Sequence, residues 1–243
     1  IIQMAREAGA LNLSQGFPDF DGPRYLLERV QHYLTHGHNQ YAPSMGAPPL
    51  RTAVAAKVAD LYGCRADPDD EITVTSGATE ALFCAIAAVV RPGDEVIVFD
   101  PAYDSYEPAV TLQGGITRHV PMHPPAYRPD WDRVADLIND RTRLIVTNTP
   151  HNPTGAVWAP EDIEALRSLL ARADAAGREI YLLADTSSST AGPTRACAAI
   201  RTCSPAASSS LPSARPITPR AGRSATAWRR RPCRPSSGGS IST

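Results

Sequence analysis

Hydrophobic and polar positions follow two alternating periods along the chain as far as Asp185. Apolar residues recur at helical spacing over Pro23–Leu34 and Pro49–Leu61, and an alanine-rich helical pattern covers Thr79–Val90. The same period predicts further helices over Asp104–Leu112, Trp131–Ile138 and Pro160–Ala176.

Short runs of β-branched and aliphatic residues lie between these helical patterns. Each is bounded by turn residues, as in Arg91-Pro92-Gly93-Asp94, and is continuous rather than alternating, which is typical of strands buried on both faces. The predicted strands are Glu71–Thr75, Glu95–Phe99, Ile116–Val120, Thr142–Asn148 and Glu179–Asp185. Regular alternation of strands and helices predicts an α/β fold, with a mainly parallel sheet sandwiched by helices.

The pattern stops after Asp185. Residues 186–243 consist mainly of Ser, Pro, Ala and Arg without a sustained apolar face. All 25 acidic residues of the chain lie at or before Asp185, whereas this tail carries nine arginines. The formal net charge of −1 is therefore the sum of an acidic first part and a basic tail. Such a segment buries too little apolar surface to offset its ordering entropy, and we expect a disordered tail.

Composition narrows the function classes only slightly. The five cysteines (64, 84, 197, 203 and 233) form no C-x-x-C pair and have no histidine at metal-ligand spacing, so we expect neither a metal site nor a disulfide framework. No apolar run approaches the length of a membrane span, and the start lacks a signal pattern, which makes the cytoplasm the default location. The chain opens at Ile1 without a methionine, as a fragment would.

Two motifs follow predicted strands at the positions where open α/β sheets bind ligands. Thr75–Glu80 (TSGATE) opens a helix, and free backbone N–H groups at a helix start can hold a phosphate. An ordinary glycine-bearing turn is the alternative. Asp100-Pro101-Ala102-Tyr103 would aim an aromatic ring at the same edge of the sheet, unless it is a simple turn with a packed tyrosine.

Two further motifs lie at the same predicted edge. Asn148–Gly155 (NTPHNPTG) carries two prolines and a glycine, so it forms a stiff loop that presents the amide of Asn152 in a fixed direction. Asp185 ends the last strand, and a carboxylate there is costly unless it meets a cation or a metal. A protonated pyridine nitrogen is one such cation, and a helix N-cap is the alternative role.

Together the motifs resemble the class I and II aminotransferases, which have the type I fold of pyridoxal-phosphate enzymes. The resemblance rests on LNLSQGFPDFDGP (residues 11–23), NQYAPSMG (39–46), TSGATEALF (75–83), FDPAYDSYEP (99–108) and NTPHNPTG, and is closest to the methionine and kynurenine aminotransferase branch. It implies that Gly77, Ala78 and Thr79 bind the phosphate of pyridoxal 5'-phosphate, together with Tyr41 of the partner subunit. It also implies that Tyr103 contacts the ring of this cofactor, Asn152 its 3-oxygen and Asp185 its ring nitrogen. Gly16 would lie near the substrate carboxylate.

The resemblance also implies an activity and a division of the chain. The activity is amino transfer from methionine, an aromatic amino acid or kynurenine to a 2-oxo acid, in a family of homodimers; lyases and decarboxylases of the same fold are a minor alternative. Residues 1–45 correspond to an N-terminal arm and small-domain segment, and 46–185 to an incomplete large domain. Residues 186–243 have no counterpart.

The sequence departs from the family pattern after Asp185. It lacks the lysine that forms the Schiff base, which the family carries in an S-F-G-K-T-like segment, and it lacks a distal substrate-binding arginine. No catalytic residue is therefore assigned. Lys57, the only lysine in the sequence, belongs by its pattern to a solvated helix face. Codons permitted for residues 211–231, read one base earlier, can encode SSFGKTYHATGWKVGYRVAPP, with the lysine overlapping Arg215. This indicates a frameshift near Asp185, from a sequencing error or in a pseudogene, and predicts an inactive chain.

A second hypothesis keeps the tail as a functional element. Nine arginines without acidic residues would give salt-sensitive, sequence-independent binding to nucleic acid phosphates, appended to a non-catalytic remnant. Trp228 is the only aromatic residue of the tail, which gives base stacking little support. Transamination by the parent enzyme therefore remains the leading hypothesis.

Overall fold

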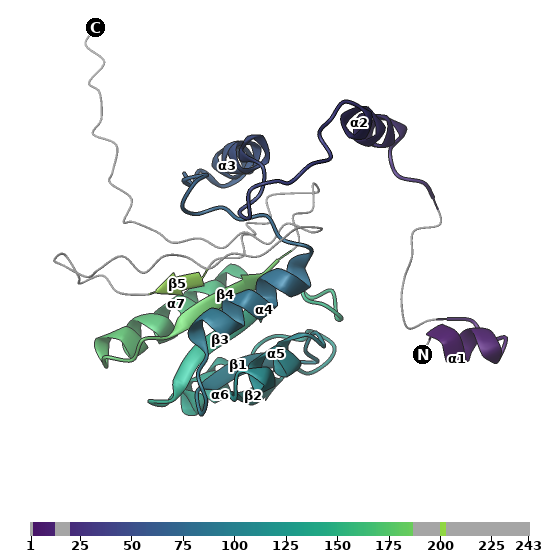
Figure 1. Cartoon of the computed structure of the whole chain (residues 1–243). Coiled ribbons are helices and arrows are strands. Elements are labelled where there is room, and N and C mark those ends of the chain that lie inside the picture. The colour runs from purple at the N-terminus through teal and green to yellow at the C-terminus, as the bar shows by residue number, and fades with distance from the viewer. Residues whose placement is uncertain (1, 13–19, 187–199, 203–243) are drawn as a thin grey trace, which may run out of the picture. The chain divides into compact units, whose positions relative to one another are not determined.

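The computed structural model describes residues 2–12, 20–186 and 200–202, and these form parts of two compact units (Figure 1). The first unit, Ile1–Ala42, contains helices α1 (Ile2–Glu7) and α2 (Arg24–Thr35). The second, Pro43–Thr243, contains every other element. Its helices are α3 (Pro48–Tyr62), α4 (Ala78–Val89), α5 (Tyr106–Leu112), α6 (Trp131–Leu137) and α7 (Pro160–Ala175).

The second unit is built on one sheet. Its strands are β1 (Glu95–Asp100), β2 (Ile116–Pro121), β3 (Thr142–Asn148), β4 (Tyr181–Asp185) and β5 (Ile200–Thr202), arranged in the order β2-β1-β3-β4-β5. The first four are mutually parallel, and β5 pairs with β4 antiparallel. The chain leaves β1 toward β2 on one side and later returns to the other side for β3. The strand order therefore reverses between β1 and β3.

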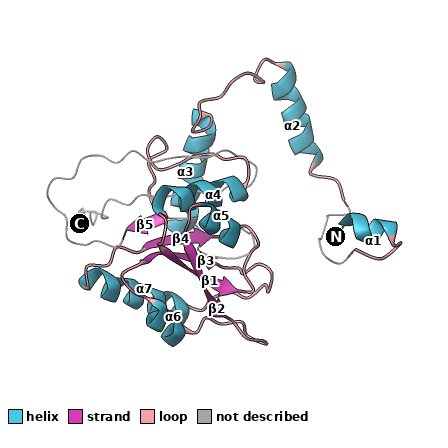
Figure 2. Cartoon of the chain, turned by 60° about the horizontal axis from the view of Figure 1, so that its bottom comes forward, coloured by secondary structure: helices cyan, strands magenta, loops and turns pink. Residues whose placement is uncertain are grey.

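Side chains alternate between the two faces of this sheet, because successive residues of a strand point in opposite directions. Val96 and Val98 of β1 pack with α4 and α5, whereas Ile97 and Phe99 of the same strand pack with α6 and α7. Figure 2 shows α4 and α5 above the sheet and α6 and α7 below it. The sheet is thus covered on both faces, as the continuous apolar strands predict.

Local sequence explains where the helices begin. The side chain of Asp130 caps α6 by accepting a hydrogen bond from the backbone N–H of Arg133 at 2.9 Å. In α7, Pro160 occupies the first turn, and the carboxylate of Asp162 reaches back to the N–H of Ala159 at 2.9 Å. These contacts orient the two helices that cover one face of the sheet.

Three details differ from the sequence-based expectations. Glu71–Thr75 is not a strand, because no strand among the described residues lies alongside it to complete a ladder, although Ile72, Thr73 and Thr75 are buried. Helix α1 is present where the sequence predicted no element. The tail contributes β5, so residues 186–243 are not wholly without regular structure.

The remaining residues of that tail, apart from Thr186, lie outside the described residues. The predicted disorder, frameshift and nucleic-acid binding of the segment are therefore untested. Within residues 2–12, 20–186 and 200–202, none of the helices has the length and apolarity that crossing a bilayer requires.

Candidate functional site

The motifs predicted to carry chemistry meet at the carboxyl edge of the sheet. Because β1, β3 and β4 are parallel, the segments that follow Asp100, Asn148 and Asp185 leave the sheet at the same edge. The strand order reverses between β1 and β3, and ligands of open α/β sheets bind at such a point. Helix α4 leads into the amino end of β1, so its own N-terminus lies at the carboxyl edge.

Asp185 is a half-buried acidic group at this edge. Its Oδ2 atom accepts a hydrogen bond of 2.6 Å from the phenol of Tyr106, which lies on α5 and is 3% exposed. Burial raises the pKa of the Asp185 carboxyl, and the Tyr106 hydrogen bond lowers it in part. Burial and the neighbouring carboxylate raise the pKa of Tyr106, so the phenol remains protonated and acts as the donor.

Asn148 links the ends of two neighbouring strands. Its Nδ2 donates to the backbone carbonyl of Asp185 at 2.8 Å, and its Oδ1 accepts from the backbone N–H of Asn152 at 2.5 Å. The paired register of Asn148 and Asp185 in β3 and β4 brings these groups together. One buried amide thus holds the strand end that carries Asp185 and the loop that carries Asn152.

The rest of that loop is held by its own hydrogen bonds. The buried His151 contacts the hydroxyl of Thr154 through Nδ1 at 2.8 Å, and its backbone N–H donates to the carbonyl of Ala156 at 2.8 Å. Burial lowers the pKa of His151, which favours the neutral form of the ring. Asn152 itself is exposed, so its side-chain amide lies outside the core.

Tyr103 is partly buried beside the Asp185 network. Its ring meets that of Tyr106 edge to face, with 5.7 Å between centroids and an interplanar angle of 70°, a favoured aromatic geometry. The same Tyr106 therefore positions both the carboxylate of Asp185 and the ring of Tyr103. The three residues form one packed group.

The start of α4 has the geometry of an anion site. Gly77 caps the helix with φ of 93°, a conformation that favours glycine, and a Cβ atom added there would meet nothing within 4 Å. The N–H of Ser76 is already taken by the carboxylate of Glu80 at 2.6 Å. The N–H groups of Gly77, Ala78 and Thr79 have no acceptor within the helix, as in any first turn, and they lie at the positive end of its dipole.

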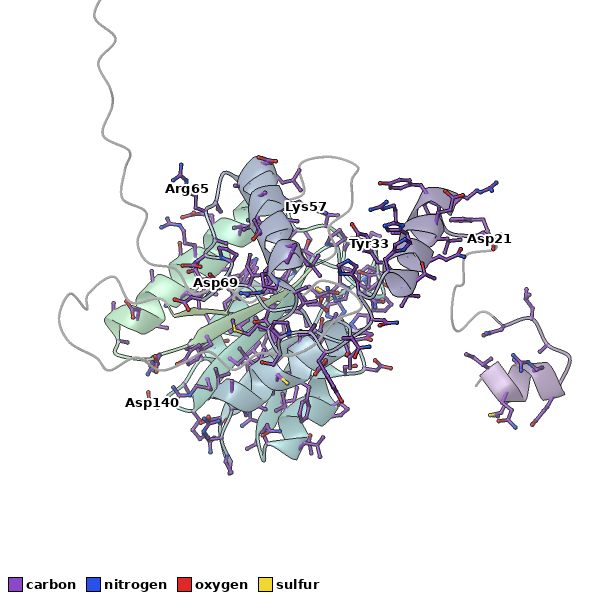
Figure 3. The ribbon with its side chains drawn as sticks, turned by 45° about the horizontal axis from the view of Figure 1, so that its top comes forward. Asp21, Tyr33, Lys57, Arg65, Asp69 and Asp140 are labelled. Carbon is purple, nitrogen blue, oxygen red and sulfur yellow. The ribbon has the colours of Figure 1, made fainter. Side chains whose placement is uncertain are left out.

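The structure thus brings together Asp185, Tyr103 and Asn152, and its topology puts the Gly77–Thr79 turn at the same edge. Gly16 lies outside the described residues. Tyr41 is fully exposed in the first unit, so its assigned role stays a prediction. Lys57 is exposed on α3, as its pattern predicts (Figure 3).

Sequence reasoning assigned no role to two residues of this group, Tyr106 and Asn148. Tyr106 and Asp185 are 79 positions apart, so their contact is invisible in the sequence. Asn148 offered a signal, since it is a polar residue that ends a continuous apolar run and remains only 8% exposed. A buried amide must find hydrogen-bond partners, which makes such a residue a candidate link.

Comparison with known proteins gives consistent results. The family profile described as aminotransferase class I and II matches residues 8–185. Methionine aminotransferase of Escherichia coli (strain K12) is 53% identical over 182 residues, covering 75% of this chain and 46% of that protein. Human kynurenine–oxoglutarate transaminase 1 is 36% identical over 186 residues, covering 71% of this chain and 44% of that protein.

Solved structures agree with these relatives. The crystal structure of an Escherichia coli protein with a methionine aminotransferase function matches with a TM-score of 0.70 at 53% identity, covering 76% of this chain and 47% of that one. N-succinyldiaminopimelate aminotransferase from Mycobacterium tuberculosis gives a TM-score of 0.70 at 39% identity, with the same coverage. The chain therefore spans about half the length of the relatives it matches.

Proposed function

Because the chain belongs to the class I and II aminotransferases, we propose that residues 46–185 form the cofactor-binding part of an enzyme that moves an amino group from an amino acid to a 2-oxo acid. Enzymes of this family depend on pyridoxal phosphate. When bound, this group supplies an electron sink for chemistry at the α-carbon of the amino acid. The chain's own residues hold and orient it.

The observation that carries the proposal is the environment of Asp185. Within the part of the chain that the structure describes, no arginine, lysine or histidine pairs with this carboxylate, although burial raises its pKa. A protonated pyridine nitrogen is a cation of suitable size to offset that desolvation. Tyr106 and Asn148 fix the carboxylate and its backbone, so the group is oriented before the cofactor arrives.

The other residues suit the remaining parts of the same molecule. The free N–H groups of Gly77, Ala78 and Thr79 fit its phosphate, and the open space beside Gly77 leaves room for it. Tyr103 offers a ring beside Asp185, and Asn152 an exposed amide on a loop that Asn148 ties down. The residues present therefore fit the cofactor at its phosphate, ring and nitrogen.

The finer proposals concern substrate and activity. Methionine, aromatic amino acids and kynurenine are the donors we propose, by similarity to relatives whose names give these substrates. We also propose that the 243-residue chain does not turn these substrates over. Its single lysine, Lys57, lies exposed on α3, and the geometry described above brings no amine to the carboxyl edge of the sheet. Proton transfer at the substrate α-carbon requires a base held within reach.

Titration of the purified chain with pyridoxal phosphate, followed by tryptophan fluorescence, tests the cofactor site. Asp185→Asn should weaken binding by about 30-fold or more, because removing one partner of a buried charge pair costs about 2 kcal/mol or more. The matched control is Asp104→Asn, which removes an exposed carboxylate from the segment that follows β1 and should leave the affinity unchanged. Equal affinity of the two variants would refute the role of Asp185.

A second assay tests the proposed lack of turnover. The chain is incubated with pyridoxal phosphate, methionine and a 2-oxo acid, and the product amino acid is measured. We expect none, and borohydride treatment should leave no cofactor covalently attached to the chain. Turnover that is lost in Lys57→Ala would show that this lysine acts as the catalytic amine and would overturn the proposal.

A further inference from the structure

The C-terminal end of α2 carries a cluster of three histidines. His32 lies in the last turn, His36 is the C-cap residue, and His38 follows within the segment HYLTHGH. All three side chains are exposed, and α2 contains no buried residue.

Two of these rings lie side by side. His32 and His36 are four positions apart, which places them on the same helix face. Their ring centroids are 4.1 Å apart, with an interplanar angle of 27°. Two imidazoles at this spacing on a helix can bind one metal ion together, as two histidines of a helical H-E-x-x-H motif do. The ring of His38 instead meets that of Tyr33 edge to face, 5.2 Å away.

The second nitrogen of His36 is already oriented. Its Nδ1 atom lies 2.7 Å from the carbonyl oxygen of His32, so a proton on Nδ1 is donated there and the lone pair is left on Nε2. Metal-binding histidines usually hydrogen-bond their other ring nitrogen to a carbonyl or carboxylate in this way, which fixes the tautomer. His36 therefore presents Nε2 in the form that a metal requires.

The position on the helix also favours a cation. The negative end of the dipole of this 12-residue helix lies at its C-terminus, where both rings are located. The basic side chain of the same helix face, Arg29, is engaged by Tyr33: its guanidinium carbon lies 4.9 Å from that ring's centroid, and Nη2 donates to the phenol at 2.9 Å. These contacts hold the guanidinium against Tyr33.

We propose that His32 and His36 form a surface chelate for one divalent transition metal ion. Imidazole nitrogen selects Cu²⁺, Ni²⁺ and Zn²⁺ over Mg²⁺ and Ca²⁺, which prefer oxygen ligands. The described residues contain no group of three or more His, Cys, Asp or Glu side chains placed to hold a metal. The site therefore has two protein ligands, His32 and His36, and water completes the coordination of the ion.

Isothermal titration of the tag-free full chain with Ni²⁺, in the presence of a non-chelating reductant, tests the proposal. We expect one site per chain, and His32→Ala and His36→Ala should each weaken it on the order of 100-fold, because the second imidazole binds intramolecularly. His123→Ala removes an exposed histidine elsewhere and should not change the affinity. Circular dichroism checks that the helical content is retained in each variant.

A rearranged variant separates geometry from histidine content. Gln31→His combined with His32→Ala keeps the number of histidines but moves one ring about 100° around the helix, away from His36. This variant should bind Ni²⁺ as weakly as His32→Ala alone. The proposal is overturned if it binds as tightly as the unmodified chain, if His32→Ala or His36→Ala leaves the affinity unchanged, or if the unmodified chain takes up no Ni²⁺.

Discussion

Glu95 gives a quantitative test of how the sheet is held together. Its carboxylate is 1% exposed at the first residue of β1. It accepts from Arg118 Nη2 of β2 at 2.7 Å and from Asn139 Nδ2 at 2.9 Å, and it forms an ion pair with Arg141 Nη2 at 2.8 Å. One buried charge thus joins β1, β2 and the segment that precedes β3. We predict that Glu95→Gln destabilises the second unit.

The size of the effect follows from the pKa. The hydrogen bond from Arg118 is the largest cause that lowers the pKa of Glu95 from 4.5 to about 2, against the opposing effect of burial. A change of that size corresponds to about 3 kcal/mol of stability at neutral pH. Since the folded pKa is the lower one, this stability is present above pH 4.5 and is lost as the pH falls through about 2. Arg118 and Arg141 regain some hydration in the variant, so we expect a loss of about 2 to 3 kcal/mol.

Urea unfolding, followed by the fluorescence of the core tryptophans Trp131 and Trp158, measures the loss. The control is Glu164→Gln, which removes an exposed carboxylate paired with Arg167 and should cost less than about 0.5 kcal/mol. At pH 3 most of the Glu95 contribution has titrated away, so the difference between Glu95→Gln and the unmodified chain should shrink to about 1 kcal/mol or less. A Glu95→Gln variant no weaker than the control at pH 7, or a difference unchanged at pH 3, would refute the reasoning.

Three further predictions concern the cofactor site, the start of α7 and the coding sequence. Tyr106→Phe keeps the packed ring but removes the donor to Asp185, and it should weaken pyridoxal phosphate binding by about tenfold in the fluorescence titration. Asp162→Ala removes the acceptor of hydrogen bonds from Arg128, Trp131 and the N–H of Ala159, and should cost about 3 kcal/mol in urea unfolding. The nucleotide sequence after the codon for Asp185 should encode a G-K-T-Y-H-like segment in another frame, and its absence from every frame would exclude the frameshift.

The parts of the fold that depend on local pattern could be predicted from the sequence. β3 has the bounds predicted from a continuous apolar run, and α6 and α7 begin at the predicted residues, where Asp130 and Pro160 mark the helix starts. The prediction of a strand at Glu71–Thr75 was wrong for a different reason. β-branched residues favour extended backbone, but a strand also requires a neighbour to complete its hydrogen bonds, and a neighbour is a non-local property.

The candidate site shows the same division between local and non-local information. A strand end, a glycine turn and a proline-bounded loop are visible as motifs, so Asp185, Gly77 and Asn152 could be proposed from the sequence. The contacts of Tyr106 and Asn148 with Asp185 could not be predicted, because they join residues that are 79 and 37 positions apart in the sequence.

Asn148 makes this dependence on register explicit. It can reach the carbonyl of Asp185 only because β3 and β4 pair with these two residues opposite each other. A shift of β4 by one residue would turn the Asp185 side chain to the other face of the sheet and move its carbonyl away from Asn148. The register of the sheet, rather than any single motif, therefore determines whether the predicted residues act as one site.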